Sequence, residues 1–394
     1  MANLIVSAGT VVTATGQAMQ NHLIYAVNSA RWWLFFIDSG STTSLQTRYS
    51  SDLITWSAGA SKTLNQAHNS EARNFAVAYK NISSNDVIHI HLTYDPTSSS
   101  HYNYHMRATI SGTTITFEAE NAIEANDTTT SVTVQGPNLA YNSANRVHAG
   151  DMMVGNGDPH EYRSTNVDNG SSWTSGFDAY NNLDSVLQFT GNRAFFDLGS
   201  TNMLHVWDNA AQNPNFTNVR WSKYTGTWSA AASIRGSDLG TSQQKNDFGS
   251  VARTTSDIHC VMRTASNTYE HFTFNGTSWS TGQSITNQTS KAGAGLFMTT
   301  DGTNVWLFII DSDSPNTVRY CSWNGTWSSW TALESTTQTR SYVSGYQSAV
   351  NGTIAVIYNQ VNGSNFDIYT TSIGGAAPVI TRTFPKSRPY SYKI

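Results

Sequence analysis

Ionisable residues recur at one position of this chain's repeated pattern, just before short segments of small residues. Such residues are rare here, because Asp, Glu, Lys and Arg make up 12% of the 394 residues, against about 25% in an average globular domain. If these segments lie side by side in a ring, the side chains line one polar funnel; solvated loop charges with local ion pairs are the alternative. The group comprises His68, Glu71, Arg73, Asp184, Lys245, Asp247, Lys291, Arg340 and Tyr342.

Two chemistries fit such a funnel. Two carboxylates drawn from Glu71, Asp184 and Asp247 would provide the acid and base of glycoside hydrolysis, although the sequence does not give the carboxylate separation that decides the mechanism. Alternatively, the funnel binds a sugar without cleaving it, since aromatic faces and planar hydrogen-bonding groups are what sugars need. No spacing singles out a catalytic set, so the sequence favours binding.

The histidines and aspartates predict no metal centre. His89 and His91 share one face of an expected strand, but no third ligand follows at a zinc-site spacing, so we expect packing or hydrogen bonding. Asp311 and Asp313 offer two hard oxygen ligands. However, Asp ends four apolar segments, at Asp38, Asp95, Asp208 and Asp311, which is typical of local turns. We therefore expect neither a metal nor another cofactor.

A unit that recurs seven times positions these residues. It holds a small-residue strand, a strongly apolar strand, an alternating strand and a turn with a closing aromatic residue. Continuous apolar character indicates strands buried on both faces. The apolar strands are 32–38, 87–95, 203–208, 257–262, 305–310 and 353–358, with 146–154 as the irregular third copy.

The closing aromatic residues set the length of the unit. They are Trp56, Phe117, Trp173, Trp228, Trp279 and Trp327, which lie 48 to 61 residues apart. This spacing suits one four-stranded blade per unit. Asn-Gly and Thr-Gly pairs before several of them predict the positive φ that hairpin turns require.

The seventh unit, 343–374, has three strand-like segments and no closing tryptophan, whereas the chain begins with one unpaired segment, 3–14. We therefore predict an all-β, seven-bladed β-propeller over residues 1–375. The segment 3–14 completes the last blade and so removes exposed sheet edges. An eight-stranded sandwich pair is the alternative fold, and it does not explain the repeat.

Residues 162–173, YRSTNVDNGSSW, resemble the Asp box of the sialidase-type (BNR-repeat) propeller superfamily, S-x-D-x-G-x-T-W, with Asn166 replacing the first Ser. In that family the motif joins two antiparallel strands and its aromatic residue fills the space between blades. The resemblance implies a turn at Asp168 and Gly170 and a sealing role for Trp173. It is a statement about architecture far more than about activity.

A sialidase-like or polysaccharide lyase activity on the same fold is the enzymatic alternative. Sialidases use three arginines, a Tyr–Glu pair and an Asp acid, and the resemblance would assign such roles to Glu71, Arg73, Asp247, Arg340 and either Tyr342 or Tyr346. The family's Arg-Ile-Pro signature is missing from residues 1–31. We therefore predict no catalytic residue from the resemblance to sialidases.

Residues 318–333 also resemble the repeat of seven-bladed propeller lectins, in which sugar sites lie between blades. The resemblance implies sugar contacts for Trp221, Trp323 and Trp330, with packing of blade on blade as the alternative. We expect a glycan or cell-surface ligand, and a purely protein-binding scaffold is a third interpretation.

Composition bounds the context. The net charge of −4 and the absence of a Lys/Arg run give no reason to expect a nucleic-acid partner. No segment is long and apolar enough to span a membrane, and no signal peptide is recognised. Cys260 and Cys321 are expected as buried free thiols.

Residues 376–394, basic and rich in proline, form an extended tail that is either disordered or docks on other proteins. We expect a virion component, such as a bacteriophage appendage, or another extracellular surface.

Overall fold

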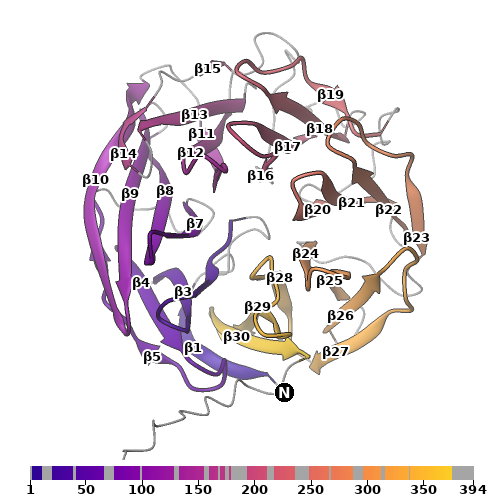
Figure 1. The fold of residues 1–394 in the computed structure, drawn as a ribbon. Coiled ribbons are helices and arrows are strands. Elements are labelled where there is room, and N and C mark those ends of the chain that lie inside the picture. Colours follow the sequence, from indigo (N-terminus) through magenta and orange to yellow (C-terminus); the bar gives the residue numbers. More distant parts are fainter. Residues whose placement is uncertain are drawn as a thin grey trace, which may run out of the picture.

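The computed structural model forms a β-propeller of strands around a central axis (Figure 1), which confirms the all-β propeller prediction. In the described part of the chain every helix-or-strand element is a strand. The described residues are 2–10, 20–38, 41–65, 75–97, 100–127, 133–154, 159–166, 169–173, 177–178, 193–210, 217–235, 248–265, 268–286, 296–311, 316–336 and 338–374.

Five sheets each correspond to one sequence unit, and their strands follow one another from the axis outwards. The first contains β7 (Phe75–Ile82), β8 (Asn85–Thr97), β9 (Ser100–Ser111) and β10 (Thr114–Asp127). The second contains β11 (Thr133–Tyr141), β12 (Val147–Val154) and β13 (Pro159–Asn166), with β14 (Asn169–Trp173) and β15 (Phe177–Asp178) both paired to β13.

The other three of these sheets have four strands each. One contains β16 (Arg193–Asp197), β17 (Met203–Ala210), β18 (Thr217–Tyr224) and β19 (Ala232–Ser233). The next contains β20 (Phe248–Thr254), β21 (Asp257–Ala265), β22 (Thr268–Phe274) and β23 (Gln283–Thr286). The last contains β24 (Phe297–Thr300), β25 (Val305–Asp311), β26 (Asn316–Trp323) and β27 (Thr331–Thr336).

The sixth sheet has nine strands and holds both the last and the first sequence unit. The last unit contributes β28 (Arg340–Gly345), β29 (Ile354–Asn362) and β30 (Asn365–Ile373). The start of the chain contributes β1 (Asn3–Thr10), β2 (Leu23–Ala26), β3 (Arg31–Asp38), β4 (Ser41–Ser50), β5 (Ser57–Ala58) and β6 (Lys62–Thr63).

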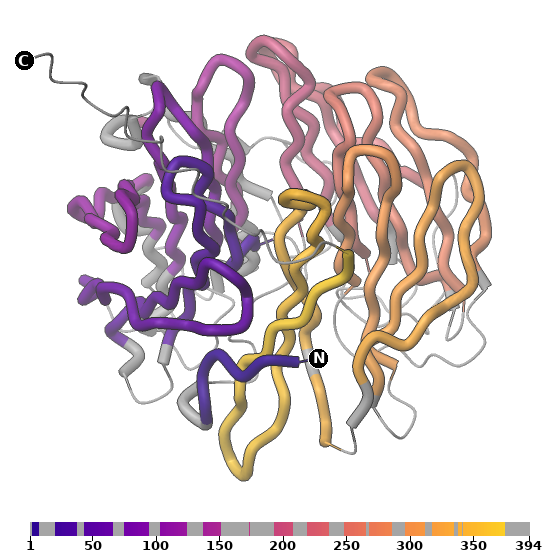
Figure 2. Tube along the Cα trace, turned by 60° about the horizontal axis from the view of Figure 1, so that its bottom comes forward, coloured from indigo at the N-terminus to yellow at the C-terminus, as the bar shows by residue number. Residues whose placement is uncertain are grey.

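The described strands therefore form six sheets, and the predicted count of seven blades is corrected to six. The cause is β1, which pairs with β30 from Asn3↔Thr370 to Thr10↔Phe366 and also with β3 at Thr10↔Asp38. This last pair of residues fuses the first and last units into one hydrogen-bonded sheet. Figure 2 shows the N-terminal segment (indigo) beside β30 (yellow).

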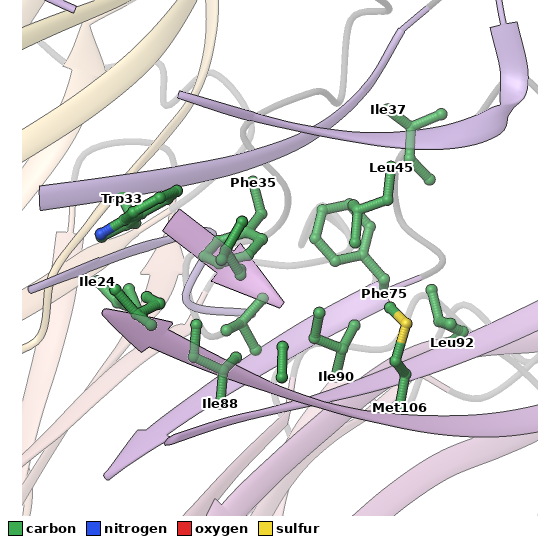
Figure 3. Packing of buried hydrophobic residues seen from close by; sticks show 14 of the residues in the cluster. Ile24, Trp33, Phe35, Ile37, Leu45, Phe75, Ile88, Ile90, Leu92 and Met106 are labelled. Atoms are coloured by element: carbon green, nitrogen blue, oxygen red, sulfur yellow. The ribbon is translucent and has the colours of Figure 1, made fainter. Parts of the chain in front are cut away.

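Apolar side chains fill the space between adjacent sheets. Trp33 and Phe35 of β3, Phe75 of β7, Ile90 of β8 and Met106 of β9 belong to one buried cluster (Figure 3). Each side chain of this kind contributes about 1.5–3 kcal/mol of transfer free energy on burial. The continuous apolar runs of the sequence are explained by this two-sided burial.

Lysine side chains also join neighbouring sheets at hairpin turns. Lys80 Nζ donates to the carbonyl oxygen of Asn142 in the next sheet's hairpin at 2.9 Å. Lys223 Nζ of β18 donates to the carbonyl oxygen of Gly276, which follows β22 in the next sheet, also at 2.9 Å. Both contacts are lysine-to-carbonyl hydrogen bonds between neighbouring sheets, but Lys80 lies on an inner strand and Lys223 on the third strand of its sheet.

Three turns that end in tryptophan share one geometry. The glycine before each tryptophan has positive φ, as predicted, at 104°, 90° and 109° for Gly226, Gly276 and Gly325. The serine after each tryptophan donates its N–H to a carbonyl oxygen of the preceding strand, and its hydroxyl accepts the N–H of the same residue. The pairs are Ser229 with Lys223, Ser280 with Thr273 and Ser328 with Ser322.

The remaining observations concern the membrane, metal and thiol predictions. In the described residues no helix suited to crossing a membrane is found, and no group of three His, Cys, Asp or Glu side chains could hold a metal. Cys260 and Cys321 are free and buried, which confirms the prediction. Burial raises the pKa of both thiols.

Candidate functional site

Most residues of the predicted funnel lie outside the described residues, so their proximity stays a prediction. These are His68, Glu71, Arg73, Asp184, Lys245, Asp247 and Lys291. The same applies to Asp168 of the turn and to the tail 376–394.

Arg340 and Tyr342 are described, and both lie on β28. The Arg340 guanidinium donates to the carbonyl oxygen of Glu334 at 2.8 Å and lies 4.6 Å from the centroid of the Tyr358 ring. Burial lowers the pKa of Arg340. Tyr342 is buried, with a φ of 52°. Neither residue lines the axial cavity described below.

The three tryptophans predicted to contact sugar make contacts between sheets. The Trp221 ring lies 5.5 Å from Phe274, and the Trp330 ring lies 6.0 Å from Tyr269. Trp323 lies 5.3 Å from the Arg253 guanidinium. These contacts have the form of the packing alternative, and the sugar role of these residues stays a prediction.

The stretch 162–173 forms a hairpin, as its Asp-box resemblance implies. Strands β13 and β14 pair at Ser164↔Trp173 and Asn166↔Asn169. The Trp173 ring packs edge-on against His105 of the preceding sheet, with ring centroids 5.1 Å apart. The turn roles of Asp168 and Gly170 stay predictions.

Buried histidines form hydrogen-bonded pairs at equivalent positions in two sheets. His89 Nδ1 lies 2.6 Å from His105 Nε2, and His259 Nδ1 lies 2.9 Å from His271 Nε2. His91 is fully buried, and burial lowers its pKa to about 4. The expectation of packing or hydrogen bonding for His89 and His91 is confirmed.

An axial cavity of about 360 Å³ is the hollow in the described structure that we identify as a candidate ligand site. Its volume lies near the lower end of the range for small-molecule sites, about 300–1,000 Å³. Inner strands of four sheets and the segment after β28 line it. The lining residues are Asn21, Ile24, Val77, Ala78, Tyr79, Lys80, Asn138, Leu139, Ala140, Tyr141, Ala194, Phe195, Tyr346, Gln347 and Ser348.

The cavity wall combines aromatic rings with a few polar groups. The Tyr79 hydroxyl is already used, since it donates to Asp86 and accepts the Val27 N–H, both at 2.8 Å. Among the described residues, the Tyr346 hydroxyl has no hydrogen-bond partner, and burial raises its pKa to about 12. Asn21 Oδ1 is buried and has no donor among the described residues. The wall therefore holds an acceptor and a hydroxyl whose hydrogen bonds are not made within the described residues.

Lys80 is the only charged side chain among the described lining residues. Its Nζ lies 5.4 Å from the centroid of the Tyr141 ring and donates to Asn142, so most of its hydrogen-bonding capacity remains unused. Burial lowers the pKa of Lys80, although the Asp197 charge opposes this effect. The sequence signal for this site is a lysine in an inner strand that otherwise holds mainly small and apolar residues, β7. Lys80 was not among the predicted site residues.

Known structures of the same fold resemble this chain. BP39L lectin from Burkholderia pseudomallei matches with a TM-score of 0.59 and 8% identity, covering 93% of this chain and 96% of the lectin. The polysaccharide lyase Uly1 matches with a TM-score of 0.56 and 10% identity, covering 94% of this chain and 92% of the lyase. No protein-family profile and no curated protein sequence matches. At these identities, the two likenesses show that the chain shares the β-propeller fold of a lectin and of a lyase.

Proposed function

We propose that this chain is a carbohydrate-binding propeller that recognises its ligand without cleaving it. The axial cavity carries the proposal. Tyr79 and Tyr141 offer ring surface for the C–H faces of a sugar, while Asn21 and Tyr346 offer hydrogen-bonding groups for its hydroxyls. A mainly apolar wall with few convergent polar groups is the usual form of a small-ligand site.

Binding is favoured over hydrolysis by the composition of the same wall. Glycoside hydrolysis by the common mechanisms uses two carboxyl groups that flank the scissile bond. None of the described lining residues is Asp or Glu. The fold shared with BP39L lectin supports a binding role, and the fold shared with Uly1 keeps a lyase as the enzymatic alternative.

The test is a glycan array followed by calorimetric titration of the sugars that bind. Tyr346→Phe removes only the hydroxyl and should weaken binding about fivefold, because a typical hydrogen bond contributes about 1 kcal/mol. Tyr369→Phe is the matched control, since Tyr369 does not line the cavity. The proposal fails if no glycan binds, or if Tyr346→Phe and Asn21→Ala bind like the wild type. Turnover of a glycan would instead establish the enzymatic alternative.

We further propose a virion or other extracellular surface as the place of action. The Ser-, Thr- and Asn-rich composition and the basic segment 376–394 support this context. Deleting 376–394 should leave glycan binding intact while removing incorporation into virus-like particles. Unchanged incorporation would remove the role of the segment in contacting other virion proteins.

A further inference from the structure

Lys80 gives the axial cavity a single positive charge with no paired anion in the described structure. Its hydrogen bond is to a neutral carbonyl, that of Asn142, and no described carboxylate forms an ion pair with it. The negative charge of Asp197 acts against the lowering of the Lys80 pKa by burial. That carboxylate accepts the Ser143 hydroxyl and the Gly199 N–H, so it is held by the hairpins of its own and the preceding sheet.

Asp86, the carboxylate on the same hairpin as Lys80, also accepts its hydrogen bonds from other groups of the protein. It is buried and accepts the N–H groups of Asn28 and Ser29, at 3.0 and 2.8 Å, and the Tyr79 hydroxyl at 2.8 Å. Asp86 therefore fixes the Tyr79 ring in the wall and does not neutralise Lys80. A partly desolvated cation without a paired anion is unfavourable, and an incoming anion removes part of that cost.

We propose that the axial cavity selects acidic sugars, whose carboxylate or sulfate group binds Lys80 while the ring lies against Tyr141 and Tyr346. This inference rests on the proposed carbohydrate-binding function and adds its substrate class. The unpartnered Asn21 oxygen accepts a sugar hydroxyl, which distinguishes a sugar from a bare anion. A neutral sugar leaves the Lys80 charge unpaired.

The experiment compares sugars that differ only in charge. Glucuronate is titrated against glucose, and galacturonate against galactose, with glucose 6-sulfate, sodium acetate and sodium sulfate as further probes of the full chain. We expect each acidic sugar to bind the wild type at least about tenfold tighter than its neutral twin, the factor that corresponds to about 1.4 kcal/mol. Added salt should weaken only the acidic sugars, because salt screens a partly exposed charge pair.

Lys80→Met removes the charge and should reduce each acidic-to-neutral ratio to about one, while Lys80→Arg should keep most of it. Lys223→Met is the matched control. It loses an equivalent 2.9 Å bond between sheets but does not line the cavity, so the ratios should equal those of the wild type. If Lys80→Met does not fold, the salt dependence of the wild type and the Lys80→Arg ratios decide.

The outcomes separate this inference from the proposed function. Equal affinity for both sugars of a pair, or a charge preference that survives in Lys80→Met, overturns the inference and leaves carbohydrate binding in place. Acetate or sulfate binding as tightly as glucuronate means a bare-anion site and also overturns it. If no sugar binds, acidic or neutral, the proposed function and the inference both fall.

Discussion

Acidification should destabilise this protein through His91, and the effect can be isolated. Burial lowers the pKa of His91 from 6.5 to about 4 in the folded chain. Below pH 6.5 the unfolded chain therefore takes up a proton that the folded chain accepts only near pH 4. The free energy of unfolding falls as the pH falls through this window, and the stabilisation is fully present above pH 6.5.

The size of the effect follows from the same pKa. The difference between a pKa of 6.5 in the unfolded chain and about 4 in the folded chain corresponds to about 3 kcal/mol. This is on the order of a third of the 5–15 kcal/mol by which a domain is typically stable. His91→Gln cannot take up a proton, but it can still reach the neighbours of the imidazole, the Asn138 carbonyl and the Asn103 amide. We expect the variant to lose about 3 kcal/mol less than the wild type between pH 7 and 4.

The assay is urea unfolding at a series of pH values, followed by tryptophan fluorescence. Ile90→Val serves as the control, because Ile90 is fully buried on the same strand and does not titrate. It should cost about 0.5–1.5 kcal/mol at every pH. An equal loss for wild type and His91→Gln between pH 6.5 and 4 would refute the reasoning, since some other group would then cause the acid sensitivity.

Three further substitutions test the packing, and each is measured by the shift in urea midpoint at pH 7. Phe75→Ala should destabilise by about 3–5 kcal/mol because it opens a cavity between two sheets; a cost near zero would contradict the packing. Asp86→Ala should cost at least about 3 kcal/mol, since it leaves four hydrogen-bond donors without their buried acceptor. Gly325→Ala should cost about 1–3 kcal/mol from backbone strain alone, because φ is 109° and no atom would contact the new methyl group. A neutral Gly325→Ala would mean that the turn relaxes.

The sequence predicted the propeller because its signal is local and repeated. The runs around Phe35 and Ile90 are apolar on both faces, and only strands packed between sheets bury both faces. The six-sheet arrangement was not predictable in the same way. It depends on the single pairing of Thr10 with Asp38, a long-range contact that no repeat pattern contains.

The cavity was missed for a related reason. Lys80, Tyr141 and Tyr346 come from three separate units, and nothing in their individual segments marks them as neighbours. The recurring charged positions gave a stronger sequence signal, yet most of them lie outside the described residues. By contrast, the histidine interactions were predictable in kind from the alternation of His89 and His91, although their partners depend on strand register.

Inner strands approach one another to different extents around the axis, and the cavity lies beside only some of them. A Cβ on Gly249 of β20 would lie 2.8 Å from the Leu296 carbonyl oxygen, just before β24, so these two inner strands meet at a distance that only glycine permits. Neither strand lines the cavity. The cavity lies instead against β7 and β11, whose Lys80 and Tyr141 are among its lining residues. Because this asymmetry makes the cavity different from any repeated position between blades, a ligand bound there contacts residues that occur once in the ring.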